Sequence, residues 1–134
     1  MKFVVAYVVT AVVFLGLDAL WLSRVALDMY RKEIGSMLLE RPSLPVAGVF
    51  YLIFVLGIVV LAIAPALASG SGWQGAMLAG AVLGLVAYGT YDITNLSTLK
   101  NWSLTVTLTD LAWGTALTAV SAAAGAFVAT ATNL

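Results

Sequence analysis

Three aspartates, Asp18, Asp92 and Asp110, lie inside stretches that are otherwise apolar enough to cross a lipid bilayer. A carboxylate near the bilayer centre costs about 2.5–3.5 kcal/mol on insertion scales, and such residues commonly mark ion, proton or substrate sites. Two of the three share a context, because Asp18 and Asp110 are each followed three residues later by a tryptophan, Trp21 or Trp113. On a helix this spacing puts the carboxylate and the indole on one face, a turn apart.

The third aspartate lies in the polar string Tyr-Asp-Ile-Thr-Asn, which runs from Tyr91 to Asn95. Clustered carboxylates in a low dielectric cannot all ionise, so such a group could share a movable proton. With aromatic rings nearby, it could instead hold a cation by charge and cation–π attraction. The alternative is a structural role, in which the aspartates only fix helix packing through hydrogen bonds. The candidate ligand- or proton-binding residues are Asp18, Asp92, Asn95, Asp110, Trp21, Tyr91 and Trp113.

Composition places the chain among integral membrane proteins. Of its 134 residues, 63% are hydrophobic and 9% are charged, and the mean hydropathy is +1.08, which is too apolar for a soluble domain. Cysteine and histidine are both absent, which excludes disulfides, thiolate metal sites and histidine-ligated haem. No metal-ligand set is predicted and the cofactor is left open. A formal charge of zero without a long basic tract argues against nucleic-acid binding.

The apolar segments predict an all-α fold, a four-transmembrane-helix bundle that forms one integral membrane domain over residues 1–134. Each segment meets the length of about 20 residues that a membrane-spanning helix needs. The first resembles a signal peptide, but Asp18 interrupts it and no small-residue cleavage site follows, so we expect it to be retained. The predicted spans are residues 3–22, 46–68, 73–96 and 104–131.

The long first connection, residues 23–40, combines apolar residues at helical spacing with charged ones. This pattern predicts an amphipathic helix in the membrane interface, broken near Gly35 and ended by Pro42; a solvated connector is the alternative. Since basic residues favour the cytoplasmic side, both termini are predicted to lie on the non-cytoplasmic side. The basic residues assigned to the cytoplasmic side are Arg24, Arg31, Lys32, Arg41 and Lys100.

This topology predicts that the three aspartates share one layer near the cytoplasmic boundary, where Arg24 or Lys100 could reach them. The second span has no ionisable residue and receives only a packing role. The third span carries small residues, Gly80 and Gly84 among them, for close packing within the bundle or across a homodimer. The fourth span carries a small and polar stripe that should face the interior: Thr107, Asp110, Gly114, Thr118, Ser121 and Gly125.

Three strings closely resemble the DUF2177 family of small bacterial inner-membrane proteins: Leu-Asp-Ala-Leu-Trp-Leu from Leu17, Tyr-Asp-Ile-Thr-Asn-Leu-Ser-Thr-Leu-Lys-Asn-Trp from Tyr91, and Thr-Asp-Leu-Ala-Trp-Gly from Thr109. The resemblance covers nearly the whole chain. It implies a multi-pass, four-helix protein of a bacterial inner membrane. It carries over no activity, substrate or cofactor.

The leading functional hypothesis is a protein that binds or transports a cation, a polar lipid or a small molecule at its acidic layer, with possible coupling to protons. A chain this short would need a homodimer to form a translocation path. The first alternative is a structural or assembly subunit of a larger membrane complex, whose aspartates pair with basic residues of a partner. The second is a lipid-modifying enzyme, which the absence of a nucleophile or paired-carboxylate metal motif disfavours.

Overall fold

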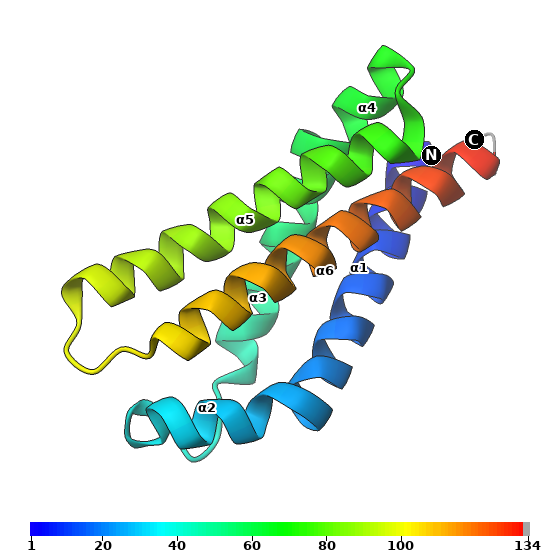
Figure 1. Ribbon diagram of the computed structural model, residues 1–134. Coiled ribbons are helices and arrows are strands. Elements are labelled where there is room, and N and C mark those ends of the chain that lie inside the picture. Colours follow the sequence, from blue (N-terminus) through cyan, green and yellow to red (C-terminus); the bar gives the residue numbers. More distant parts are fainter. Residues whose placement is uncertain (133–134) are drawn as a thin grey trace.

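The computed structural model describes residues 1–132, and over these residues the chain is all-helical, without a strand. Four helices in this part of the chain are long and apolar enough to cross a membrane, which confirms the predicted architecture (Figure 1). The elements are α1 (Lys2–Trp21), η1 (Leu22–Ala26), α2 (Leu27–Ile34), η2 (Gly35–Met37), α3 (Leu44–Ile58), η3 (Val59–Ile63), α4 (Ala64–Ser69), α5 (Gly72–Thr98) and α6 (Leu104–Ala131).

The first span leads through η1, a π-helical turn, into the short helix α2, which runs across one end of the bundle (Figure 1). We call this the α2 end; the turn between α4 and α5 lies at the opposite, α4 end. On α2, Ile34 is buried whereas Arg31 and Lys32 are exposed, so this helix is amphipathic, as predicted. It ends at Ile34 and a 3₁₀ turn begins at Gly35, close to the predicted break.

A contact between α2 and the start of α6 fixes α2 in place. The Ser103 hydroxyl donates a hydrogen bond to Glu33 Oε2 at 3.0 Å. Ser103 is also the N-cap of α6, where its side chain accepts from the Val106 backbone N–H at 3.1 Å. A carboxylate beside a helix N-terminus is favoured by the helix dipole. The start of α6 and the position of α2 are therefore determined together.

Helices α5 and α6 pack against each other at very short range, because glycines face one another across their interface. A Cβ added to Gly80 would lie 2.8 Å from the Thr118 carbonyl oxygen, and one added to Gly84 would overlap the Gly114 carbonyl. The predicted small-residue face of the third span therefore packs within the chain. It leaves no room for a homodimer interface on the same face.

The second span is interrupted by η3, a π-helical turn over Val59–Ile63. Pro65, two residues after this turn, has no N–H to donate to the Leu61 carbonyl, and its ring would clash with that carbonyl in a regular α-helix. A wider turn relieves this clash. At the end of the span, Gly70 has a φ of +80° and closes the helix with a left-handed residue.

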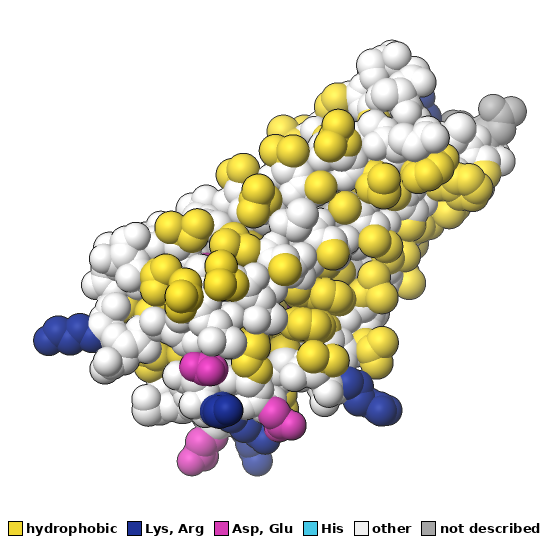
Figure 2. All heavy atoms as spheres, in the orientation of Figure 1, with side chains coloured by type: hydrophobic (Ala, Val, Ile, Leu, Met, Phe, Trp, Pro, Cys, Tyr) yellow, Lys and Arg dark blue, Asp and Glu magenta, His cyan; other side chains and the backbone are white. Residues whose placement is uncertain are grey.

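The bundle surface suits a bilayer. Hydrophobic side chains cover the length of the helices, whereas most charged side chains gather at the α2 end (Figure 2). The interior contains the stripe predicted on the fourth span, since Thr107, Asp110, Gly114, Thr118, Ser121 and Gly125 are all buried on α6. The apolar core is built around Phe14, Val55, Ile58, Ile63 and Leu117.

Candidate functional site

The three aspartates are buried in the bundle near the α2 end. Their exposed fractions are 6% for Asp18, 0% for Asp92 and 7% for Asp110. They come from three different helices, α1, α5 and α6. Because lipid cannot hydrate a carboxylate, the partners that each one finds inside the protein decide what it can do.

Asp18 has a donor for each carboxylate oxygen. The Trp113 indole Nε1–H donates to Oδ1 at 3.0 Å, and the Tyr51 hydroxyl donates to Oδ2 at 2.7 Å. These bonds join α1 to α6 and to α3. Tyr51 corrects the prediction that the second span only packs, because this span supplies a direct partner of the acidic layer.

Asp110 receives its hydrogen bond from outside the four spans. The Tyr30 hydroxyl on α2 donates to Asp110 Oδ1. Tyr30 belongs to the segment that the sequence predicts to be an interfacial amphipathic helix, for which we predicted no role at the acidic layer. The structure shows instead that α2 covers the acidic layer and contributes a side chain to it.

Asp92 differs from the other two. Both of its carboxylate oxygens are buried and neither has a hydrogen-bond donor. Its carboxyl group lies near that of Asp110, close enough for the two groups to interact electrostatically. Because an unpaired buried charge costs several kcal/mol, we expect at least one of these two carboxyl groups to carry a proton.

Aromatic rings surround the carboxylates. Trp21 and Trp113 stack with ring centroids 4.4 Å apart and planes 8° from parallel, so the repeated Asp–Trp spacing brings the two indoles together. The Trp21 Nε1 is buried without a hydrogen-bond partner. On α5, Tyr88 packs its ring into the space that Gly114 leaves open on α6.

Two predicted site residues lie at the margin. Tyr91 is 57% exposed and makes an edge-to-face contact with Trp102 at a centroid distance of 5.7 Å. Asn95 is half-buried, beside Tyr91. The structure therefore brings Asp18, Asp92, Asp110 and the two stacked indoles together and turns Tyr91 outward.

The basic residues that could have paired with the aspartates point elsewhere. Arg24 and Lys100 are both exposed, and the hydrogen bonds to Asp18 and Asp110 come from tyrosine and tryptophan. Within residues 1–132, no three acidic side chains are grouped closely enough to hold a metal ion. The side chains that donate to Asp18 and Asp110 are therefore all neutral.

The Tyr51–Asp18 bond leads to a stability prediction. Tyr51→Phe leaves one buried oxygen of Asp18 without a donor, which should lower the free energy of unfolding by about 1–3 kcal/mol. Denaturant unfolding of the detergent-solubilised protein measures this change. Tyr91→Phe is the matched control, because Tyr91 is exposed, and it should change stability by less than about 0.5 kcal/mol. Equal effects for the two variants would show that the bond to Asp18 contributes nothing.

Comparison with known proteins places the whole bundle in one family. The model of the family described as "Predicted membrane protein (DUF2177)" matches residues 3–127, which include all three aspartates and α2. No curated protein and no solved structure matches the chain.

Proposed function

The chain belongs to the DUF2177 family of predicted membrane proteins, and we propose that it binds a small monovalent cation at the Asp92–Asp110 pair in exchange for a proton. The observation that carries this proposal is the Asp92 carboxyl group, fully buried with two oxygens that lack donors. A structural aspartate would be expected to have donors, as Asp18 does.

The donor set supports a proton and a monovalent cation more than a divalent metal. Ca²⁺ takes six to eight oxygen ligands, several of them carboxylates, whereas no group of three acidic side chains in residues 1–132 is placed so that it could hold a metal ion. Two adjacent carboxyl groups in a low dielectric retain one proton between them. A monovalent cation can replace that proton without changing the net charge of the pair.

The aromatic rings around the pair support the same assignment. Trp113 bonds to Asp18 and stacks on Trp21, and the Tyr88 ring packs against Gly114, so apolar walls lie beside the acidic layer. Such walls strengthen charge interactions by excluding water. They also favour a cation that can shed its hydration shell over one that holds it firmly, as Mg²⁺ does.

The side of the membrane is part of the proposal. Four exposed basic residues lie in or next to α2, and Lys100 lies in the short turn at the same end. By the positive-inside rule this end faces the cytoplasm, so the cation would enter from there, past α2 and Tyr30. By the same rule both termini would lie on the non-cytoplasmic side, and a bacterial inner membrane is the location we propose. The basic residues near α2 are Arg24, Arg31, Lys32 and Arg41.

Burial weighs against the assembly role. An aspartate that pairs with a partner's helix has to face the outside of the bundle, whereas Asp18, Asp92 and Asp110 are each at most 7% exposed. A homodimer remains part of the transport proposal. Since α6 covers the glycine face of α5, a dimer would have to use another surface.

A flux assay tests the proposal. Purified protein is reconstituted into liposomes that contain a trapped pH-sensitive dye, and an outward gradient of K⁺, Na⁺ or tetramethylammonium is imposed. We expect a pH change inside the liposomes that depends on the protein with at least one of these cations. Protein-containing liposomes that respond like empty ones to all three would contradict the transport function.

A further inference from the structure

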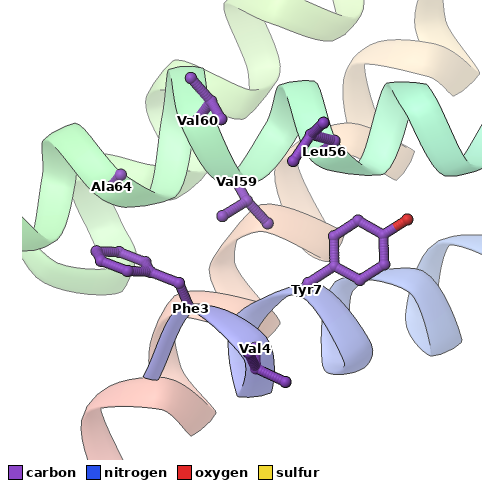
Figure 3. A pocket seen from close by; sticks show the side chains of 7 residues that line it. All are labelled: Phe3, Val4, Tyr7, Leu56, Val59, Val60 and Ala64. Carbon is purple, nitrogen blue, oxygen red and sulfur yellow. The ribbon is translucent and has the colours of Figure 1, made fainter. Parts of the chain in front are cut away.

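An apolar groove lies on the outside of the bundle near the α4 end, far from the acidic layer. It has a volume of about 500 Å³, within the range of about 300–1,000 Å³ that is usual for small-molecule sites. Figure 3 shows side chains of the first and second spans facing each other across it. The lining residues are Phe3, Val4, Tyr7, Leu56, Val59, Val60 and Ala64.

The groove results from local features of these two spans. The π-helical turn that Pro65 imposes contains Val59 and Val60, and its wider backbone shifts these side chains relative to a regular helix. Ala64 follows with a small side chain. The Tyr7 hydroxyl donates to the Leu52 carbonyl at 3.0 Å, so the only polar group of the lining is already paired. A molecule bound in the groove would therefore contact only apolar parts of these side chains.

Charge at the mouth of the groove distinguishes the possible occupants. The Lys2 ammonium lies 5.2 Å from the centroid of the Phe3 ring, and Phe3 lines the groove. The six acidic residues of the chain all lie outside the groove and its mouth, from Asp18 onward. An apolar chain with an anionic head fits this arrangement, whereas a second copy seated here about a twofold axis would bring two Lys2 ammonium groups together, which is unfavourable.

We propose that this groove binds one acyl chain of an anionic phospholipid, whose phosphate group lies at Lys2 in the leaflet at the α4 end. Inside the bilayer the acyl chain is already surrounded by hydrocarbon, so van der Waals packing against the groove lining is what would hold it there. A basic residue at the membrane surface adds a preference for anionic lipids. The site is separate from the acidic layer, and its test does not depend on cation exchange.

Native mass spectrometry tests the lipid site. Delipidated protein is mixed with equal amounts of phosphatidylglycerol and phosphatidylcholine that carry the same acyl chains, and the lipid that stays bound is counted. The wild type should retain one phosphatidylglycerol, with a preference of about fivefold over phosphatidylcholine, as expected for one basic residue. Lys2→Gln should bring this ratio close to one. A ratio that Lys2→Gln leaves unchanged would overturn the role of Lys2.

A second variant tests the groove itself. Ala64→Phe puts a ring into the space and should reduce retention of both lipids several-fold, whereas Ala116→Phe, at an exposed position of α6, should retain lipid like the wild type. Retention by Ala64→Phe equal to that of Ala116→Phe would overturn the groove as the binding site. A wild-type protein that appears as a lipid-free dimer, and as a monomer in Ala64→Phe, would identify a second copy as the occupant and overturn the proposal.

Discussion

Replacing Asp92 with asparagine is expected to abolish cation-driven proton exchange while the protein stays folded and at least as stable as the wild type. The buried Asp92 oxygens have no donor side chain, and the asparagine amide N–H can donate to Asp110 in place of the shared proton. The substitution does remove the group that holds the exchanged proton. We expect the flux in liposomes to fall to the level of empty liposomes, and the unfolding midpoint in detergent to stay the same or to rise, because an unpaired buried carboxyl group is costly.

The matched control is Asp28→Asn, which changes an exposed acid on α2 and removes the same formal charge. Its flux should stay within about twofold of the wild type, since a surface charge contributes little. If Asp92→Asn keeps full flux, Asp92 does not hold the exchanged proton. If Asp92→Asn unfolds the protein, the Asp92 carboxyl group stabilises the fold even though its oxygens have no hydrogen-bond donor.

Gly84→Ala is expected to destabilise the bundle strongly for a change of a single methyl group. The new Cβ would overlap the Gly114 carbonyl and come within 2.8 Å of Thr118 Oγ1, so α5 and α6 would have to move apart. Overpacking of this kind costs about 1–3 kcal/mol. Because Asp92 and Asp110 lie on these two helices, separation should also reduce proton exchange. Denaturant unfolding and the liposome assay measure the two effects.

Gly57→Ala provides the control for Gly84→Ala. A Cβ at Gly57 would meet nothing within 4 Å, so only the gain in helix propensity remains, about 1 kcal/mol in favour of alanine. The two substitutions should therefore change stability in opposite directions. Equal stabilisation by both would show that the close approach of α5 and α6 tolerates a side chain and does not position the aspartates.

Features that depend only on the spacing of residues within one segment were predictable from the sequence. The four spans and the buried stripe on α6 depend on hydropathy and on the helical repeat, both of which can be read locally. The shared Asp–Trp spacing predicted an indole on the same helix face as each carboxylate, whereas the observed bond joins Trp113 to Asp18 on another helix, 95 residues away. Being next to a site residue in the sequence did not place Tyr91 in the site. Tyr91 directly precedes Asp92, but consecutive residues of a helix do not share a face.

Contacts between distant segments were not predictable in this way. Tyr51 is 33 residues from Asp18, and Tyr30 is 80 residues from Asp110. A tyrosine near the end of an apolar span is also typical of interfacial anchoring, so its type alone did not indicate a site. The position of α2 over the acidic layer depends on the Glu33–Ser103 contact, which no pattern within either segment contains.

The most direct test of the central claim is the infrared difference spectrum of the wild-type protein in lipid, recorded with and without the cation that drives flux. A proton held between Asp92 and Asp110 gives a carboxylic acid C=O band, which should disappear when the cation binds and should be absent from the difference spectrum of Asp92→Asn. A wild-type spectrum in which the cation changes no carboxylic acid band would contradict exchange of a cation for a proton at this pair.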